Sequence, residues 1–142
     1  MRQRVSMCSD NARRKTRPED DLAKGFNGKK ILVAEDDELV ALMLSDQLAE
    51  MGFGEIEITS SVAAALQKLG AFRPDVALLD VQLADGSTSA LARVLNMRSI
   101  PFAVMSGDPA KARRLSPPKV PPLAKPFSPA TLREAIQAAL DN

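Results

Sequence analysis

Short apolar runs alternate along this chain with stretches of helical periodicity. The apolar runs that we interpret as strands are ILVA at 31–34, EIEIT at 55–59, VALLD at 76–80 and PFAVMS at 101–106. Strands that alternate with helices predict a parallel sheet with helices on both faces. At 142 residues, 45% of them hydrophobic, the chain has material for one core but too little length for two full domains.

The apolar spacing between these runs predicts the helices. We expect helices over 38–51, 62–69, 87–96, 109–115 and from Pro129 toward the chain end. The first has helical spacing through Leu39, Leu42, Met43 and Leu48. The proline-rich run SPPKVPPLAKPF leaves room only for a very short fifth strand near 120–124.

Composition excludes several kinds of chemistry. With no histidine, the chain has neither a Ser–His or Cys–His nucleophile pair nor a histidine metal ligand. A single cysteine, Cys8, cannot form an internal disulfide, which is typical of a cytoplasmic protein. No apolar run reaches the roughly 18 residues of a membrane span, and no signal peptide is evident, so we expect no membrane association.

Residues 1–28 differ from the rest in charge and pattern. They lack a sustained period, so we expect a mostly disordered arm followed by a folded domain at 29–142. Residues 1–30 carry nine Lys/Arg and four Asp/Glu, whereas the remainder carries ten and fourteen. The basic cluster at 13–17 could contact nucleic acid or an acidic partner, but three acids at 19–21 offset it and favour a solvated tail. With aromatics at 4%, the folded domain is not expected to bind nucleic acid.

Polar side chains stand at the carboxyl ends of four predicted strands. Glu35 and Asp36 follow the first strand, and Asp80 ends the third. Ser106 ends the fourth, and Lys125 follows the fifth. Parallel strands bring these ends to one edge of the sheet, where α/β proteins bind ligands. We therefore expect all five side chains to share one pocket.

The charges of this pocket favour a metal-assisted reaction at a carboxylate. Three neighbouring carboxylates raise one another's pKa values unless a cation neutralises them. Mg²⁺ suits oxygen ligands, and the lack of histidine and cysteine ligands argues against zinc. One carboxylate could then attack a phosphoryl group, while Lys125 neutralises its oxygens and Ser106 hydrogen-bonds one of them. Together, these side chains predict that an aspartate of the pocket becomes phosphorylated.

Residues 30–141 resemble the receiver domain of two-component response regulators. The motifs that carry the resemblance are ILVAEDDELV, RPDVALLDVQLADG, IPFAVMSGD and LAKPF, which occur in this order, each at an apolar strand. The resemblance implies a flavodoxin-like (βα)5 fold, a doubly wound five-stranded parallel sheet of order 2-1-3-4-5.

The resemblance also implies a set of Mg²⁺ ligands. Asp36 and Asp80 would bind the ion directly, together with the backbone carbonyl of Gln82. Glu35 would act mostly through a metal-bound water. Asp37 is expected instead to cap the first helix.

Further roles implied by the resemblance concern phosphoryl transfer. Asp80 would accept the phosphoryl group from a phosphohistidine on a sensor histidine kinase or phosphotransfer protein. Ser106 and Lys125 would hold the group, and the Lys125–Pro126 peptide would be cis. Such a protein is a bacterial signalling receiver and not an enzyme with a turnover substrate, although it catalyses its own phosphorylation and dephosphorylation.

We therefore expect a stand-alone response regulator whose output is protein contact or phosphate relay. The sequence leaves the downstream partner and the oligomeric state open. The face formed by the helix at 109–115, the strand at 120–124 and the last helix is the candidate dimer surface.

Two departures from the family pattern leave alternatives open. Leu83 and Ala84 replace the usual Met-Pro pair in a shortened loop, and Pro122 occupies a position that is usually aromatic. These changes motivate a rival function, a phosphorylation-independent interaction module with an altered output face. A second rival is a phosphohydrolase, but Asp85, five positions after Asp80, is poorly placed to protonate a leaving group.

Overall fold

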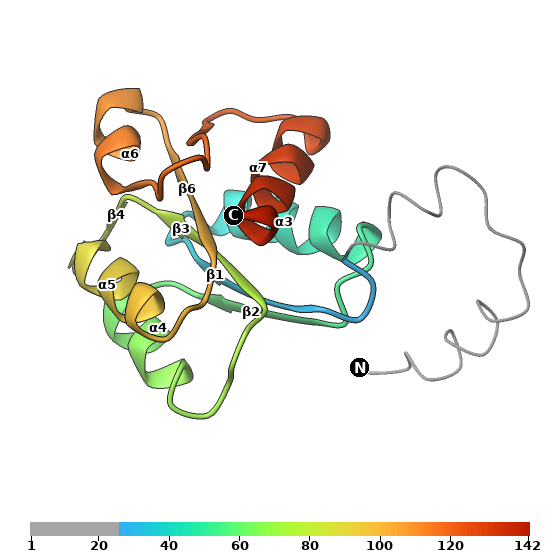
Figure 1. The fold of residues 1–142 in the computed structure, drawn as a ribbon, viewed down its shortest axis with the longest axis horizontal. Helices are drawn as coiled ribbons and strands as arrows, with labels where there is room; N and C mark the ends of the chain where they lie inside the picture. Colours follow the sequence, from blue (N-terminus) through green and yellow to red (C-terminus); the bar gives the residue numbers. More distant parts are fainter. Residues whose placement is uncertain (1–25) are drawn as a thin grey trace, which may run out of the picture.

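Five parallel strands form the central sheet in the computed structural model, which describes residues 26–142 (Figure 1). They are β1 (Lys30–Ala34), β2 (Glu55–Thr59), β3 (Val76–Asp80), β6 (Phe102–Ser106) and β7 (Leu123–Ala124). Their spatial order is β2-β1-β3-β6-β7, which confirms the predicted 2-1-3-4-5 arrangement of a flavodoxin-like fold. Two short strands, β4 (Gln82–Leu83) and β5 (Gly86–Ser87), form a separate antiparallel hairpin that the sequence interpretation did not include.

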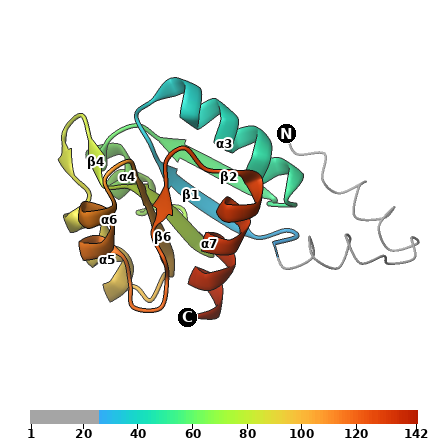
Figure 2. The ribbon, with the colours of Figure 1, turned by 90° about the horizontal axis from the view of Figure 1, so that it is seen from above.

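Helices cover both faces of the sheet. They are α3 (Glu38–Glu50), α4 (Val62–Lys68), α5 (Ser89–Met97), α6 (Pro109–Leu115) and α7 (Pro129–Asp141). Helices α3 and α7 lie on one face, and α4, α5 and α6 lie on the other (Figure 2). Helix α5 begins at Ser89 and not at the predicted residue 87, because Gly86 and Ser87 pair with β4.

Alternation along the strands divides the core into two layers. In β1, Ile31 and Val33 pack with α3 and α7, whereas Leu32 and Ala34 pack with residues of α4 and α5. Burial on both faces explains why the central strands are continuous apolar runs.

Helix α3 buries a different face from the one that its sequence suggested. Of the four predicted spacing residues, only Leu48 is buried; Leu39 is 77% exposed and Leu42 is 62% exposed. The second buried leucine is Leu44, one helical turn before Leu48. The helix carries two apolar stripes, and contact with the sheet selects the stripe that contains Leu44.

Residues 1–25 of the predicted arm lie outside the described part of the chain. Phe26, which that prediction also placed in the arm, is fully buried and stacks on Phe53 with ring centroids 5.2 Å apart. Gly28 takes a positive φ of 77° and donates its N–H to the carbonyl of Gly52. The core therefore includes a residue that the sequence interpretation had left out of the domain.

Within residues 26–142, no helix combines the length and the apolar character that crossing a membrane requires.

A carboxylate and lysine site at the carboxyl edge of the sheet

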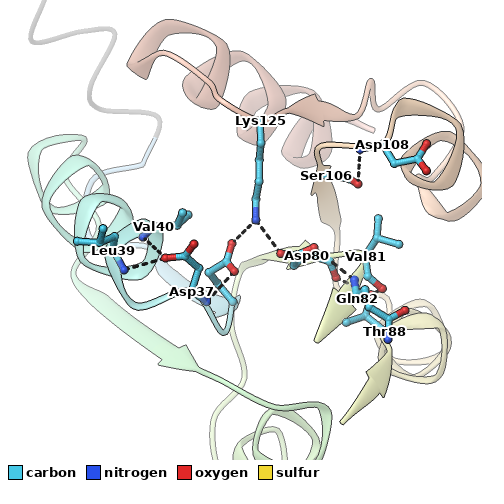
Figure 3. A network of polar contacts seen from close by, with 11 residues as sticks. Asp37, Leu39, Val40, Asp80, Val81, Gln82, Thr88, Ser106, Asp108 and Lys125 are labelled. Carbon is cyan, nitrogen blue, oxygen red and sulfur yellow. Dashed lines mark hydrogen bonds and ion pairs between the residues drawn. The ribbon is translucent and has the colours of Figure 1, made fainter. Parts of the chain in front are cut away.

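Four of the predicted site residues meet where β1, β3 and β7 end. The Nζ of Lys125 lies 2.6 Å from Oε1 of Glu35 and 2.7 Å from Oδ2 of Asp80 (Figure 3). Carboxylate oxygens of Glu35, Asp36 and Asp80 all lie within 4.8 Å of one another. We call Glu35, Asp36, Asp80, Ser106 and Lys125 the carboxyl-edge site.

Glu35 is the buried acid of this site. Its side chain is fully buried, and it accepts hydrogen bonds from Lys125 and, at 3.0 Å, from the backbone N–H of Asp37. Burial raises the pKa of Glu35, and this effect outweighs the hydrogen bonds that favour the charged form. Both carboxylate oxygens of Glu35 already have a donor.

Lys125 provides the positive charge at the centre of the site. Burial acts to lower the pKa of Lys125, but hydrogen bonds to Asp80 and Glu35 outweigh burial, so the pKa is raised. The backbone N–H of Lys125 donates to the carbonyl of Ser106, which joins the lysine to the end of β6. The Lys125–Pro126 peptide is cis, as the resemblance implied.

Asp36 is exposed at the entrance of the site, whereas the neighbouring Asp37 has a structural role. Asp37 accepts the backbone N–H groups of Leu39 and Val40 at 2.9 and 3.2 Å and so caps α3, as predicted (Figure 3). The cap begins α3 directly behind the acid pair and leaves Asp36 facing solvent.

Asp80 ends β3 and is held on its backbone side by a residue that the sequence interpretation missed. Thr88 is fully buried, and its hydroxyl contacts the carbonyl oxygens of Asp80 at 2.7 Å and Val81 at 3.1 Å. Thr88 precedes α5, yet its side chain makes no capping bond to that helix. A threonine just before a helix predicts a cap, so the sequence pattern gave no signal for this support of Asp80.

The Gln82 carbonyl is not taken up by the β4–β5 hairpin. In the hairpin, Thr88 donates its N–H to the carbonyl of Val81. Hydrogen-bonded and non-hydrogen-bonded pairs alternate along an antiparallel ladder, so the next pair, Gln82 and Ser87, exchanges no backbone hydrogen bonds. The backbone N–H of Gln82 donates instead to Oδ1 of Asp80 at 3.3 Å.

Ser106 lies at the same edge but does not hydrogen-bond the acids. It is 8% exposed, and its hydroxyl oxygen accepts the backbone N–H of Asp108 at 2.9 Å (Figure 3). Asp108 in turn caps α6 by accepting from Ala110 and Lys111. The hydroxyl is therefore linked to the start of α6.

Asp85 has a structural role at the start of α4. Its two carboxylate oxygens accept the backbone N–H groups of Val62 and Ala63 at 2.8 and 3.1 Å. These two hydrogen bonds lower the pKa of Asp85, which keeps the residue ionised. An ionised carboxylate that caps a helix is a poor proton donor to a leaving group, which argues against the phosphohydrolase interpretation.

A doubly wound parallel sheet with carboxylates, a lysine and a hydroxyl at its carboxyl edge defines the class of receiver domains. The family model described as "Response regulator receiver domain" matches residues 31–137, and the chain therefore belongs to this family.

Individual relatives agree with this assignment. The chain is 33% identical over 118 residues to a protein-glutamate methylesterase/protein-glutamine glutaminase of Anaeromyxobacter dehalogenans, covering 80% of this chain and 35% of that protein. It is 31% identical over 117 residues to the phyllosphere-induced regulator PhyR of Methylorubrum extorquens, covering 78% of this chain and 43% of that protein. The chain thus spans less than half the length of these curated relatives.

Among solved structures, the chain is similar to the signal receiver domain of a signal transduction histidine kinase from Syntrophus aciditrophicus. The TM-score is 0.67 with 25% identity, and the alignment covers 80% of this chain and 90% of that one. Receiver domains are signalling modules, and the match to the methylesterase covers only about a third of that enzyme.

Proposed function

We propose that this receiver accepts a phosphoryl group on Asp80 from a phosphohistidine of a partner protein in a Mg²⁺-dependent reaction. The signal then passes on through changed protein contacts or by phosphate relay. The observation that carries the proposal is the ammonium of Lys125, 2.7 Å from Oδ2 of Asp80 at the open edge of the sheet. A fixed cation beside a partly exposed carboxylate is placed to neutralise the oxygens of an incoming phosphoryl group.

In the proposed reaction, an oxygen of Asp80 attacks phosphorus. The new P–O bond forms as the P–N bond to the partner's imidazole breaks, and the bonding electrons stay on that nitrogen. Lys125 holds the phosphoryl oxygens by charge. The Ser106 oxygen accepts the N–H of Asp108, so its own hydroxyl proton is available for a phosphoryl oxygen.

The residues present fit Mg²⁺, because the donor set consists of oxygens alone and three carboxylates converge within 4.8 Å. Asp36 and Asp80 would hold the ion together with the Gln82 carbonyl, which the hairpin does not use. Glu35, with both oxygens already bonded, would act through water. When bound, the ion would supply positive charge that offsets the repulsion between the carboxylates and an approaching anionic group.

A surface beside the site suits the phosphodonor. Helix α3 starts at the carboxyl-edge site and exposes Leu39, Leu42 and Met43 on its outer face. Exposed apolar side chains that cluster on one helix mark interaction sites. We propose that the partner carrying the phosphohistidine contacts this stripe of α3.

Incubation with acetyl phosphate and Mg²⁺, followed by intact-protein mass measurement, tests the reaction. The wild-type protein should gain the mass of one phosphoryl group, and Asp80→Asn should gain none. Asp75→Asn is the matched control, since Asp75 lies at the opposite end of β3 and bonds the backbone of Lys30. An adduct on Asp80→Asn, or none on the wild type, would overturn the proposal.

Absence of an adduct would favour the second candidate, a phosphorylation-independent interaction module. Pro122 supports this candidate, because the position lacks the aromatic ring that the family uses to couple the hydroxyl to the output face, and the chain contains no tyrosine.

A further inference from the structure

An open hollow with a volume of about 420 Å³ lies beside α6 and the loop that leads to β7. The residues that line it and carry the argument are Arg113, Pro117, Pro118, Lys119, Pro121 and Pro122. We call it the proline hollow. It is separate from the carboxyl-edge site, whose residues do not line it.

The wall of the proline hollow is rigid before any ligand arrives. Prolines have a fixed φ, and Ser116, before Pro117, is held in an extended conformation. The Val120 N–H donates to the Pro117 carbonyl at 3.2 Å and closes a tight turn, while the Val120 side chain is buried. A partner that binds here orders little of the protein, so little entropy is lost on binding.

Lys119 occupies a strained position in this turn. Its φ is +71°, in the left-handed region, at the turn position where glycine is favoured. Strained residues of this kind cluster at binding sites. Lys119 also lines the hollow, so this turn carries a positive charge at its edge.

Two exposed cations, Arg113 and Lys119, line the hollow, and neither makes an ion pair within the described residues. Helix α6 also carries Lys111 and Arg114, which are exposed but do not line the hollow. The ion pairs among residues 26–142 involve only Lys30, Lys68 and Lys125. The surface therefore has charge complementarity to an anionic partner.

We infer that the proline hollow binds an acidic, extended segment of a partner protein. Nucleic acid fits less well because no aromatic ring lines the hollow for base stacking. Acidic side chains would pair with Arg113 and Lys119, while the segment's aliphatic atoms pack on the proline rings. This binding does not require phosphorylation of Asp80, so its test is independent of the test of the proposed function.

Fluorescence anisotropy of the full chain with a labelled peptide of alternating glutamate and aspartate tests this inference. Replacing both Arg113 and Lys119 by glutamine should raise the dissociation constant about fivefold, because the binding free energy of two exposed ion pairs is lost. The matched control replaces Lys29 and Arg93, two basic residues outside the hollow, by glutamine. Its dissociation constant should stay within about twofold of the wild-type value.

A second variant separates loss of charge from loss of structure. Lys119→Gly removes the charge but suits the positive φ, so it should weaken peptide binding while raising the melting temperature. Equal binding by wild type and the Arg113/Lys119 double variant would overturn the inference. So would binding of labelled oligothymidylate that equals the peptide in affinity and in its dependence on these two residues.

Discussion

The Nζ of Lys125 lies 2.7 Å from Oδ2 of Asp80, although the two residues are 45 positions apart in the chain. Parallel pairing of β3 with β6 and of β6 with β7 brings them to one edge, and Glu35 at the end of β1 completes the contact. One ammonium thus neutralises charge from two strand ends. Both the stability of this edge and its chemistry depend on that single cation.

Removing the cation should destabilise the fold. Lys125→Met leaves the buried carboxylate of Glu35 without its ion-pair partner, and we expect a loss of about 2 kcal/mol in the free energy of unfolding in urea. This value lies below that of a fully buried pair because the Lys125 side chain is 23% exposed. Added Mg²⁺ should restore part of the loss. Lys111→Met, an exposed change on α6, is the control, and equal stabilities of the two variants would contradict the account.

The Lys125 contact should also make stability fall at alkaline pH. Its pKa is raised above the ordinary 10.5, so the stability it contributes is complete below 10.5 and is lost as pH rises through the higher folded value. The difference in unfolding free energy between wild type and Lys125→Met should therefore shrink above pH 10.5. The chain has no tyrosine to obscure this range. A difference that stays constant with pH would be inconsistent with the raised pKa.

Asp85 should give the opposite pH dependence at the acid end. Its pKa is lowered below the ordinary 3.8, so its contribution is present above 3.8 and is lost as pH falls through the lower folded value. Asp85→Asn should be less stable than wild type at neutral pH and equally stable once Asp85 itself is protonated. Asp46→Asn removes the same charge from an exposed position on α3 and serves as the control. Thermal unfolding across acid pH values checks the prediction.

Ser106 should affect the rate of phosphoryl transfer more than the fold. Ser106→Ala removes a hydroxyl placed to hydrogen-bond a phosphoryl oxygen, and we expect transfer from acetyl phosphate to slow by at least about tenfold. Ser106→Thr keeps the hydroxyl and should retain most of the rate. Quantifying the adduct over time measures both variants. Equal rates for wild type and Ser106→Ala would show that the hydroxyl takes no part.

The sheet and the convergence of the acids were predictable because they depend on strong patterns. VALLD and PFAVMS are continuously apolar up to their last residue, so they indicate strands that are buried on both faces. Parallel pairing then brings the carboxyl ends of these strands to one edge of the sheet. The position of Asp80 and Lys125 at one edge of the sheet therefore follows from topology.

Features set by tertiary contact were not predictable. Helix α3 has two apolar stripes, and nothing local to the sequence selects Leu44 over Leu42 as the buried residue. The support of Asp80 by Thr88 depends on the β4–β5 hairpin, whose strands of two residues are too short to have a periodicity. The positive φ of Lys119 also had no sequence signal, because that position favours glycine.

The most direct test of the central claim is the location of the phosphoryl group after reaction with acetyl phosphate and Mg²⁺. Borohydride reduces an acyl phosphate to an alcohol, and peptide mass spectrometry then identifies the modified position. The account predicts modification at Asp80 alone, lost when Mg²⁺ is chelated and strongly reduced in Asp36→Asn. Modification at another carboxylate, or at Asp80 with equal yield after chelation, would contradict it.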